Sequence, residues 1–130
     1  MKAAGKFEVK LSPLDTYATG TNGVGLGRMS IDKTFTGNLD ATSKGEMLTA
    51  MSPVQGSAGY VAIEQVTGTL TGRKGSFVLQ HSGTMSNGDT HLILNVVPDS
   101  GTDQLLDLTG EMTIKIEDGQ HFYEFEYELA

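Results

Sequence analysis

The sequence predicts an all-β fold: a single antiparallel barrel of eight strands that spans residues 1–130. Segments of alternating apolar and polar residues follow one another along the chain, and short turns that contain glycine separate most of them. No segment keeps a helical period for three turns or more. Eight antiparallel strands with short connections close most simply into an up-and-down barrel, which has room inside for side chains or one small ligand.

The central hairpin, Ala58–Ser86, gives the clearest information about the interior. One face of its first strand carries Tyr60, Ala62, Glu64 and Val66, and one face of its second strand carries Phe77, Leu79 and His81. Both faces of both strands are largely apolar, with isolated polar residues on each. A sheet with one buried face alternates more cleanly than this. We therefore expect an interior that holds a few polar groups and an exterior that meets a second surface.

Three strands are expected before this hairpin, at Gly5–Leu11, Arg28–Thr36 and Leu39–Met51, each from its alternation. Pro13 is expected to end the first strand, because proline cannot donate to a central ladder. Gly45 predicts a bulge in the third. The long segment 14–27 is either a flap over one barrel end or a mobile loop.

Three more strands are expected after the hairpin, at Thr90–Val97, Gly110–Glu117 and Gln120–Leu129, with a short helical turn in 102–108. Asn87-Gly88 and Asp118-Gly119 favour two-residue hairpin turns, because both residue types tolerate positive φ. The last strand alternates most sharply. Its glutamates must face water, so its aromatic row, which includes Tyr123, is expected to face the interior.

Composition excludes several classes of function. The formal net charge of −7 argues against nucleic acid and against anionic membranes as partners. There is no cysteine, so neither a disulfide framework nor a thiol nucleophile is available. The N-terminus lacks the apolar run of a signal peptide, and no apolar segment is long enough to span a bilayer. We expect a soluble, cytoplasmic protein.

No motif indicates a cofactor or a metal. Residues 23–27 are rich in glycine but lack the spacing of a dinucleotide or phosphate loop, which favours a flexible loop. His81, His91 and His121 lie on three different strands without the spacing of a metal site, so structural or surface roles are favoured. No Gly-x-Ser-x-Gly elbow supports a hydrolase triad.

Charged residues on apolar strands are the remaining candidates for chemistry. Glu8 and Lys10 share one face of the first strand, and Glu64 and His81 are candidates for facing a shared space. Burial inside a barrel would perturb the proton affinity of these groups, as a general acid or base requires. The alternative is that these charges lie outside, in solvent or in a subunit contact.

The central stretch also carries a resemblance. The runs from Tyr60 to Gly72 and from Gly75 to Gly83, with Gly110-Glu-Met-Thr-Ile and the ending Tyr123-Glu-Phe-Glu-Tyr127, resemble an uncharacterised bacterial family grouped with the allene oxide cyclase-like barrels. The resemblance implies an eight-stranded, calycin-type barrel that self-associates around a mostly apolar cavity. It also implies that Glu8, and Lys10 in place of an asparagine, lie near a bound substrate. The position of a water-binding proline is matched by Pro13.

These observations leave three hypotheses. In the first, the barrel binds an apolar or amphipathic small molecule, and its ligand-binding residues are Glu8, Lys10, Tyr60, Glu64, His81 and Tyr123. In the second, it is a cyclase or isomerase that works without a cofactor and uses Glu8 as acid or base. In the third, it is a structural or interaction module: side chains fill the barrel, and the apolar outer face of the first, fourth and fifth strands, with Phe7, Val9 and Leu11 as its main indication, forms a homo-oligomer. The third is compatible with the first.

Overall fold

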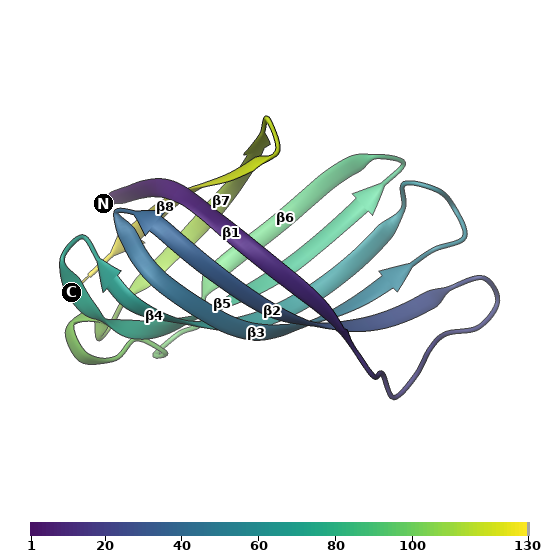
Figure 1. Cartoon of the computed structure of the whole chain (residues 1–130), viewed down its shortest axis with the longest axis horizontal. Helices are drawn as coiled ribbons and strands as arrows, with labels where there is room; N and C mark the ends of the chain where they lie inside the picture. Colours follow the sequence, from purple (N-terminus) through teal and green to yellow (C-terminus); the bar gives the residue numbers. More distant parts are fainter. Residues whose placement is uncertain (130) are drawn as a thin grey trace.

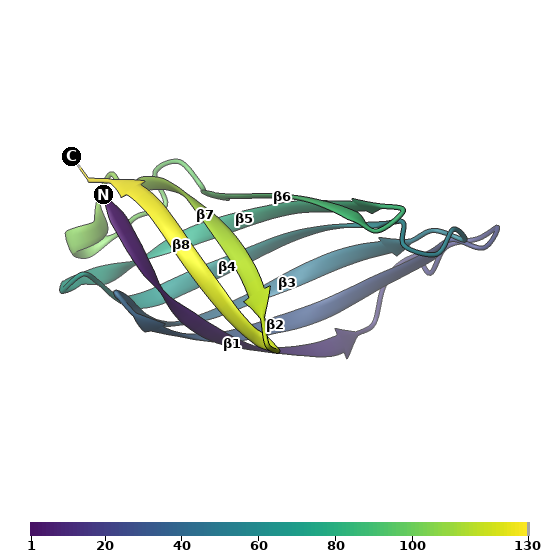
Figure 2. The same cartoon turned by 90° about the horizontal axis from the view of Figure 1, so that it is seen from above.

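The computed structural model describes residues 1–129 and shows a closed antiparallel barrel with its strands in sequence order (Figures 1 and 2). The strands are β1 Lys2–Leu14, β2 Gly25–Gly37, β3 Leu39–Met51, β4 Ala58–Leu70, β5 Arg73–Ser86, β6 Asp89–Val96, β7 Thr109–Glu117 and β8 Gln120–Glu128. A single 3-10 turn, η1 (Asp103–Leu105), lies between β6 and β7. The predicted fold class is therefore confirmed. No helix within residues 1–129 is long and apolar enough to cross a bilayer.

The barrel has unequal sides because its strands differ in length. Strands β1 to β5 have 13 or 14 residues each, whereas β6 to β8 have 8 or 9. β8 closes the barrel against β1 only from Lys2 to Phe7, and the rest of β1 pairs with β2 alone. Figure 2 shows the long strands continuing beyond the β7–β8 hairpin. One end of the barrel is thus walled on all sides, and the other is more open.

Pro13 does not end β1, contrary to the sequence prediction. The strand continues to Leu14, and Pro13 pairs with Met29 of β2. β8 has ended before this point, so β1 is an edge strand there. Edge strands tolerate proline because one side of the strand has no ladder to maintain.

The walled end is packed solid with apolar side chains. Phe77 stacks on Phe125, and Phe125 on Tyr127, with ring centroids 5.8 and 5.3 Å apart. Leu105 of η1 and Leu108 after it are buried in the same cluster. The glutamates of β8 are exposed and the alternate aromatic residues Tyr123, Phe125 and Tyr127 are buried, as the alternation predicts. The large apolar cavity of the protein lies in the other half of the barrel.

Candidate functional site

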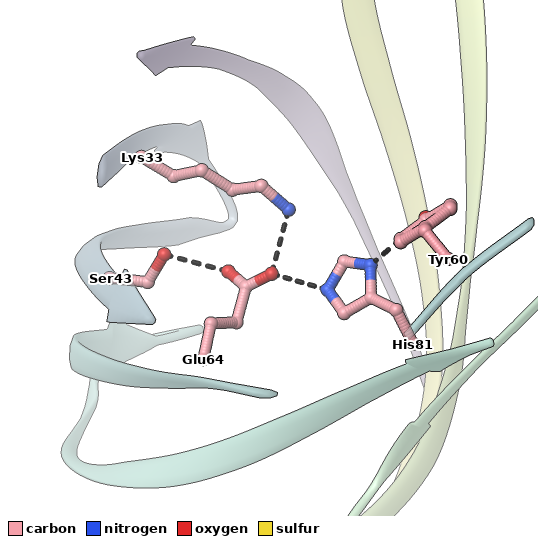
Figure 3. Close-up of polar contacts among 5 residues, drawn as sticks. All are labelled: Lys33, Ser43, Tyr60, Glu64 and His81. Carbon is pink, nitrogen blue, oxygen red and sulfur yellow. Dashed lines mark hydrogen bonds and ion pairs between the residues drawn. The ribbon is translucent and has the colours of Figure 1, made fainter. Parts of the chain in front are cut away.

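A cluster of polar side chains lies inside the barrel where the packed half ends. We call Lys33, Ser43, Glu64 and His81 the floor cluster; all four are buried, and Tyr60 adjoins them (Figure 3). Glu64 is at its centre. Its Oε1 accepts a hydrogen bond from Ser43 Oγ at 2.7 Å, and its Oε2 accepts one from Lys33 Nζ at 2.8 Å. The same Oε2 contacts His81 Nε2, and His81 Nδ1 lies 3.4 Å from the Tyr60 hydroxyl.

The pleat of four adjacent strands brings these side chains together. Lys33 comes from β2, Ser43 from β3, Glu64 and Tyr60 from β4, and His81 from β5. Lys33 and Ser43 are directly opposite each other in the β2–β3 ladder, as are Tyr60 and Gly83 in the β4–β5 ladder. Residues on the inward face of neighbouring strands meet inside a barrel. The cluster is therefore a consequence of register, although its members are far apart in sequence.

Gly45 of β3 makes room for Glu64. A Cβ atom on Gly45 would lie 2.8 Å from the Glu64 Cβ and 2.0 Å from the Ile63 carbonyl oxygen. Pairing runs without interruption through Gly45, opposite Ile31 on one side and Glu64 on the other. The predicted bulge at Gly45 is therefore wrong. The glycine permits the close approach of a neighbouring strand.

Glu64 is ionised at neutral pH. Burial alone would raise its pKa, but hydrogen bonds and charge attraction from His81 and Lys33 outweigh burial and lower the pKa to about 2. A carboxylate can only accept, so His81 must carry its proton on Nε2 to bond with it. In the neutral imidazole, Nδ1 is then an acceptor, and the Tyr60 hydroxyl donates to it. Burial, and then the charge of Glu64, raise the pKa of Tyr60, which keeps the phenol protonated.

Lys33 is held by aromatic rings as well as by Glu64. Its Nζ lies 4.9 Å from the centre of the Phe7 ring and 5.8 Å from that of Phe35. A cation over a ring face is attracted by the ring quadrupole, more strongly when it is desolvated. These contacts fix the ammonium group at the bottom of the open half of the barrel.

An apolar cavity of about 690 Å³ occupies that open half. Its walls include Val9, Leu11, Ile31, Met47, Met85 and Ile114. Lys33, His81 and Tyr60 also line it, whereas Glu64 lies behind them. Along β5 the inward residues run from Leu79 in the core through His81 and Gly83 to Met85 in the cavity wall. The floor cluster therefore forms the boundary between the solid and the hollow half.

The structure brings three of the six predicted site residues, Tyr60, Glu64 and His81, to this cavity floor. Tyr123 faces inward but lies in the packed half. Its hydroxyl accepts from the Leu39 amide at 2.9 Å and donates to the Thr36 carbonyl at 2.8 Å. Tyr123 is therefore a structural residue away from the cavity.

Glu8 and Lys10 do not face the cavity, contrary to the sequence hypothesis. Both are exposed on the outside of β1, because Phe7 and Val9 take the inward positions of that strand. Glu8 instead borders a separate hollow of about 540 Å³, together with the exposed Lys6. The same alternation along β1 also contradicts the part of the third hypothesis that concerns this strand.

Phe7, Val9 and Leu11 were expected on the outer surface in that hypothesis, but they line the cavity. They cannot form the apolar outer face that it required. The fourth strand of that hypothesis does carry exposed apolar residues on the outside, Val61 and Ile63 of β4, and β3 and β6 add Leu48 and Ile93.

Lys33 and Ser43 are functional candidates that the sequence reasoning missed. A signal for Lys33 was present, because it shares the inward face of β2 with Ile31 and Phe35. A lysine between two such residues is either a break in the pattern or a buried charge that needs a partner. Ser43 carries no comparable signal, since serine is common on either face of a strand.

The histidines do not form a metal site with one another. His91 and His121 also line the wide cavity, but within residues 1–129 no three His, Cys, Asp or Glu side chains converge as a metal ion requires. His121 packs against the Phe7 ring, with centroids 5.1 Å apart.

Comparison with known proteins places the chain in a family. The family model described as "Protein of unknown function (DUF3224)" matches residues 3–127. The chain belongs to the DUF3224 family. The crystal structure of a DUF3224 protein of unknown function from Shewanella oneidensis MR-1 has 61% sequence identity to it and a TM-score of 0.98. That match covers 100% of this chain and 97% of the other. No curated protein matches the chain.

The expected resemblance to an uncharacterised family is thus confirmed as membership of DUF3224. The expected kinship with allene oxide cyclases and calycins stays a prediction.

Proposed function

We propose that this DUF3224 protein binds an amphipathic small molecule inside its barrel. The apolar part of the ligand lies against the cavity walls, and its polar head reaches Lys33, His81 and Tyr60 at the floor. The observation that carries the proposal is an apolar cavity that ends on a buried polar cluster. Ligand pockets combine these two features, because apolar walls supply affinity and a few polar groups fix orientation.

The size of the cavity supports this function. Its volume of about 690 Å³ lies within the range of roughly 300–1,000 Å³ that is typical of small-molecule sites. Buried polar groups are costly in a protein that needs only a stable core. Apolar residues in place of a buried ion pair such as Lys33 and Glu64 are often neutral or stabilising, so a solely structural role gives no reason to keep the pair.

Titration with a panel of uncharged hydrophobic fluorescent dyes and long-chain alcohols tests the proposal. Ala58, in the cavity wall, is changed to Phe to reduce the space, and the exposed Glu8 is changed to Gln as a matched control. We expect saturable binding to the wild type and to Glu8→Gln, and at least tenfold weaker binding to Ala58→Phe. Absence of saturable binding to the wild type would overturn the proposal, as would equal binding by all three proteins.

Self-association is a second proposed property, supported by a different surface. Leu48 of β3, Val61 and Ile63 of β4, and Ile93 of β6 point outward and are 48–56% exposed. In the ladders Leu48 is opposite Val61, so these side chains are neighbours. Sedimentation at micromolar concentration should show an oligomer that Ile63→Lys dissociates. A wild-type protein that sediments as a monomer would contradict this proposal.

An isomerase or cyclase that needs no cofactor is the enzymatic alternative. Glu8 cannot be its acid or base inside the cavity, because Glu8 lies on the outer face of β1. Titratable groups that line the cavity are Lys33, Tyr60 and His81 at the floor, and His91 and His121 higher in the wall. Of these, the floor residues are connected to one another by hydrogen bonds through Glu64.

A further inference from the structure

We propose that Tyr60, His81 and Glu64 form a proton relay that removes a proton from the carbon next to a carbonyl group, while Lys33 binds the carbonyl oxygen. The substrate class is an uncharged, mostly apolar ketone or aldehyde. This inference rests on the proposed binding of a small molecule in the cavity, and adds a reaction to it.

The relay is a continuous chain of hydrogen bonds that begins at the cavity. Tyr60 lines the cavity, and its hydroxyl lies 3.4 Å from His81 Nδ1. The opposite ring nitrogen of His81, Nε2, bonds to the Glu64 carboxylate. A carboxylate on one ring nitrogen fixes the imidazole orientation and stabilises the imidazolium that forms when the other nitrogen takes a proton. Hydrogen bonds of this kind are often long before a substrate binds, and shorten in the complex.

Lys33 is placed to stabilise the oxygen of the substrate. Its Nζ and His81 Nε2 contact the same oxygen of Glu64, so the ammonium and the imidazole are neighbours on the floor (Figure 3). An ammonium has three N–H groups, and one of them reaches Glu64 Oε2. Because Lys33 also lines the cavity, its remaining donors can reach a ligand oxygen. A preorganised donor in a water-poor site stabilises negative charge that develops there.

The charge balance of the floor selects an uncharged substrate. The positive charge of Lys33 is balanced by the negative charge of ionised Glu64. Both carboxylate oxygens of Glu64 already accept hydrogen bonds from Ser43 and Lys33, so the floor offers donors to a ligand. A ligand carboxylate would accept those bonds, but it would add a buried charge that the apolar walls cannot compensate. A carbonyl oxygen accepts the same bonds without that cost.

The reaction balances without a co-reactant. The Cα–H bond of the substrate breaks, and its proton moves to the Tyr60 oxygen as the tyrosine proton moves to His81 Nδ1. The electron pair of the C–H bond enters the enolate, whose oxygen accepts a hydrogen bond from Lys33. The reverse transfers return a proton to the same carbon. In a conjugated dienolate they return it to the γ carbon, which shifts the double bond.

Gly83 positions the tyrosine. A Cβ atom on Gly83 would lie 2.4 Å from Cε1 of the Tyr60 ring, so the ring occupies space that any other residue would fill. Tyr60 is directly opposite Gly83 in the β4–β5 ladder. The backbone of β5 therefore supports the ring from which the relay begins.

Deuterium incorporation into 2-decanone in D₂O, followed by proton NMR, tests the relay, and affinity for 2-decanone is measured in parallel. We expect the wild type and the outer-surface control Glu8→Gln to exchange the α-protons faster than buffer. Tyr60→Phe and His81→Gln should lower kcat for exchange at least ~100-fold, the usual contribution of general acid–base catalysis. KM should stay within about threefold, because the relay acts on the transition state. A structural defect would change both constants.

The outcomes separate this inference from the proposed function. If 2-decanone binds but no exchange exceeds that in buffer, the relay is overturned and ligand binding stands. If the dyes bind and 2-decanone does not, the substrate class is overturned alone. If neither binds, both proposals fall. Exchange that persists in Tyr60→Phe also overturns the relay, and this variant removes only one oxygen atom, so it stays interpretable if His81→Gln does not fold.

Discussion

Replacing Glu64 with glutamine removes the negative charge of the floor cluster and keeps the shape of the side chain. Lys33 then remains buried and positively charged, with its counter-ion removed. Truncating one partner of a buried ion pair leaves an uncompensated charge and costs roughly 3–5 kcal/mol. We expect Glu64→Gln to lower the free energy of unfolding by a similar amount at pH 7.

The pKa of Glu64 gives a second, independent value for the contribution of this carboxylate to the free energy of unfolding. Its pKa falls from the ordinary value of 4.5 to about 2 in the folded protein. A difference of one in pKa between the folded and unfolded protein corresponds to about 1.4 kcal/mol, so ionisation of Glu64 stabilises the fold by ~3 kcal/mol. Because the pKa is lowered on folding, this contribution is fully present above about pH 4.5 and is lost as the pH falls through about 2.

Urea unfolding of the wild type and of Glu64→Gln between pH 2 and pH 7 measures both effects. We expect a difference of ~3 kcal/mol at pH 7 that shrinks below pH 4.5. Glu124→Gln, on the exposed face of β8, is the matched control and should differ from the wild type by less than ~0.5 kcal/mol. A difference below ~1 kcal/mol at pH 7, or one that does not change with pH, would refute the electrostatic reasoning.

Two further predictions concern packing and buried hydrogen bonds. Gly45→Ala should destabilise the protein by more than ~2 kcal/mol in the same assay, because its Cβ would clash with the backbone of β4. Gly25→Ala, whose Cβ would meet no atom within 4 Å, should change stability by less than ~1 kcal/mol, and equal effects would contradict the reasoning. Tyr123→Phe should cost ~1–3 kcal/mol, since it leaves the Leu39 amide without its hydroxyl partner. An unchanged melting temperature for Tyr123→Phe would contradict that expectation.

Much of the barrel was predictable from alternation, because a strand with one face in a core must keep a two-residue period. The β8 row shows this most clearly: Glu124 and Glu126 alternate with Tyr123 and Phe125, and the structure places them outside and inside as expected. The short turns at Asn87-Gly88 and Asp118-Gly119 likewise join adjacent strands.

The site was only partly predictable, because alternation gives the face of a residue and not its level along the barrel axis. The stagger of the strands sets that level, and a single sequence does not show it. Tyr123 and Tyr60 both face inward, yet one hydroxyl lies in the packed half and the other beside the cavity. Glu8 and Lys10 were placed inside by resemblance, although the alternation of Phe7 and Val9 opposed it.

NMR titration of ¹⁵N-labelled protein with 2-decanone tests the central claim most directly, since it locates a ligand in solution. We predict that the imidazole nitrogens of His81 and the amides of cavity residues such as Ile31 and Met85 shift together and saturably. Resonances on the outer face, such as those of Val61 and Ile63, should stay unchanged. Shifts confined to that outer face, with the His81 imidazole unaffected, would contradict a ligand site on the floor of the barrel.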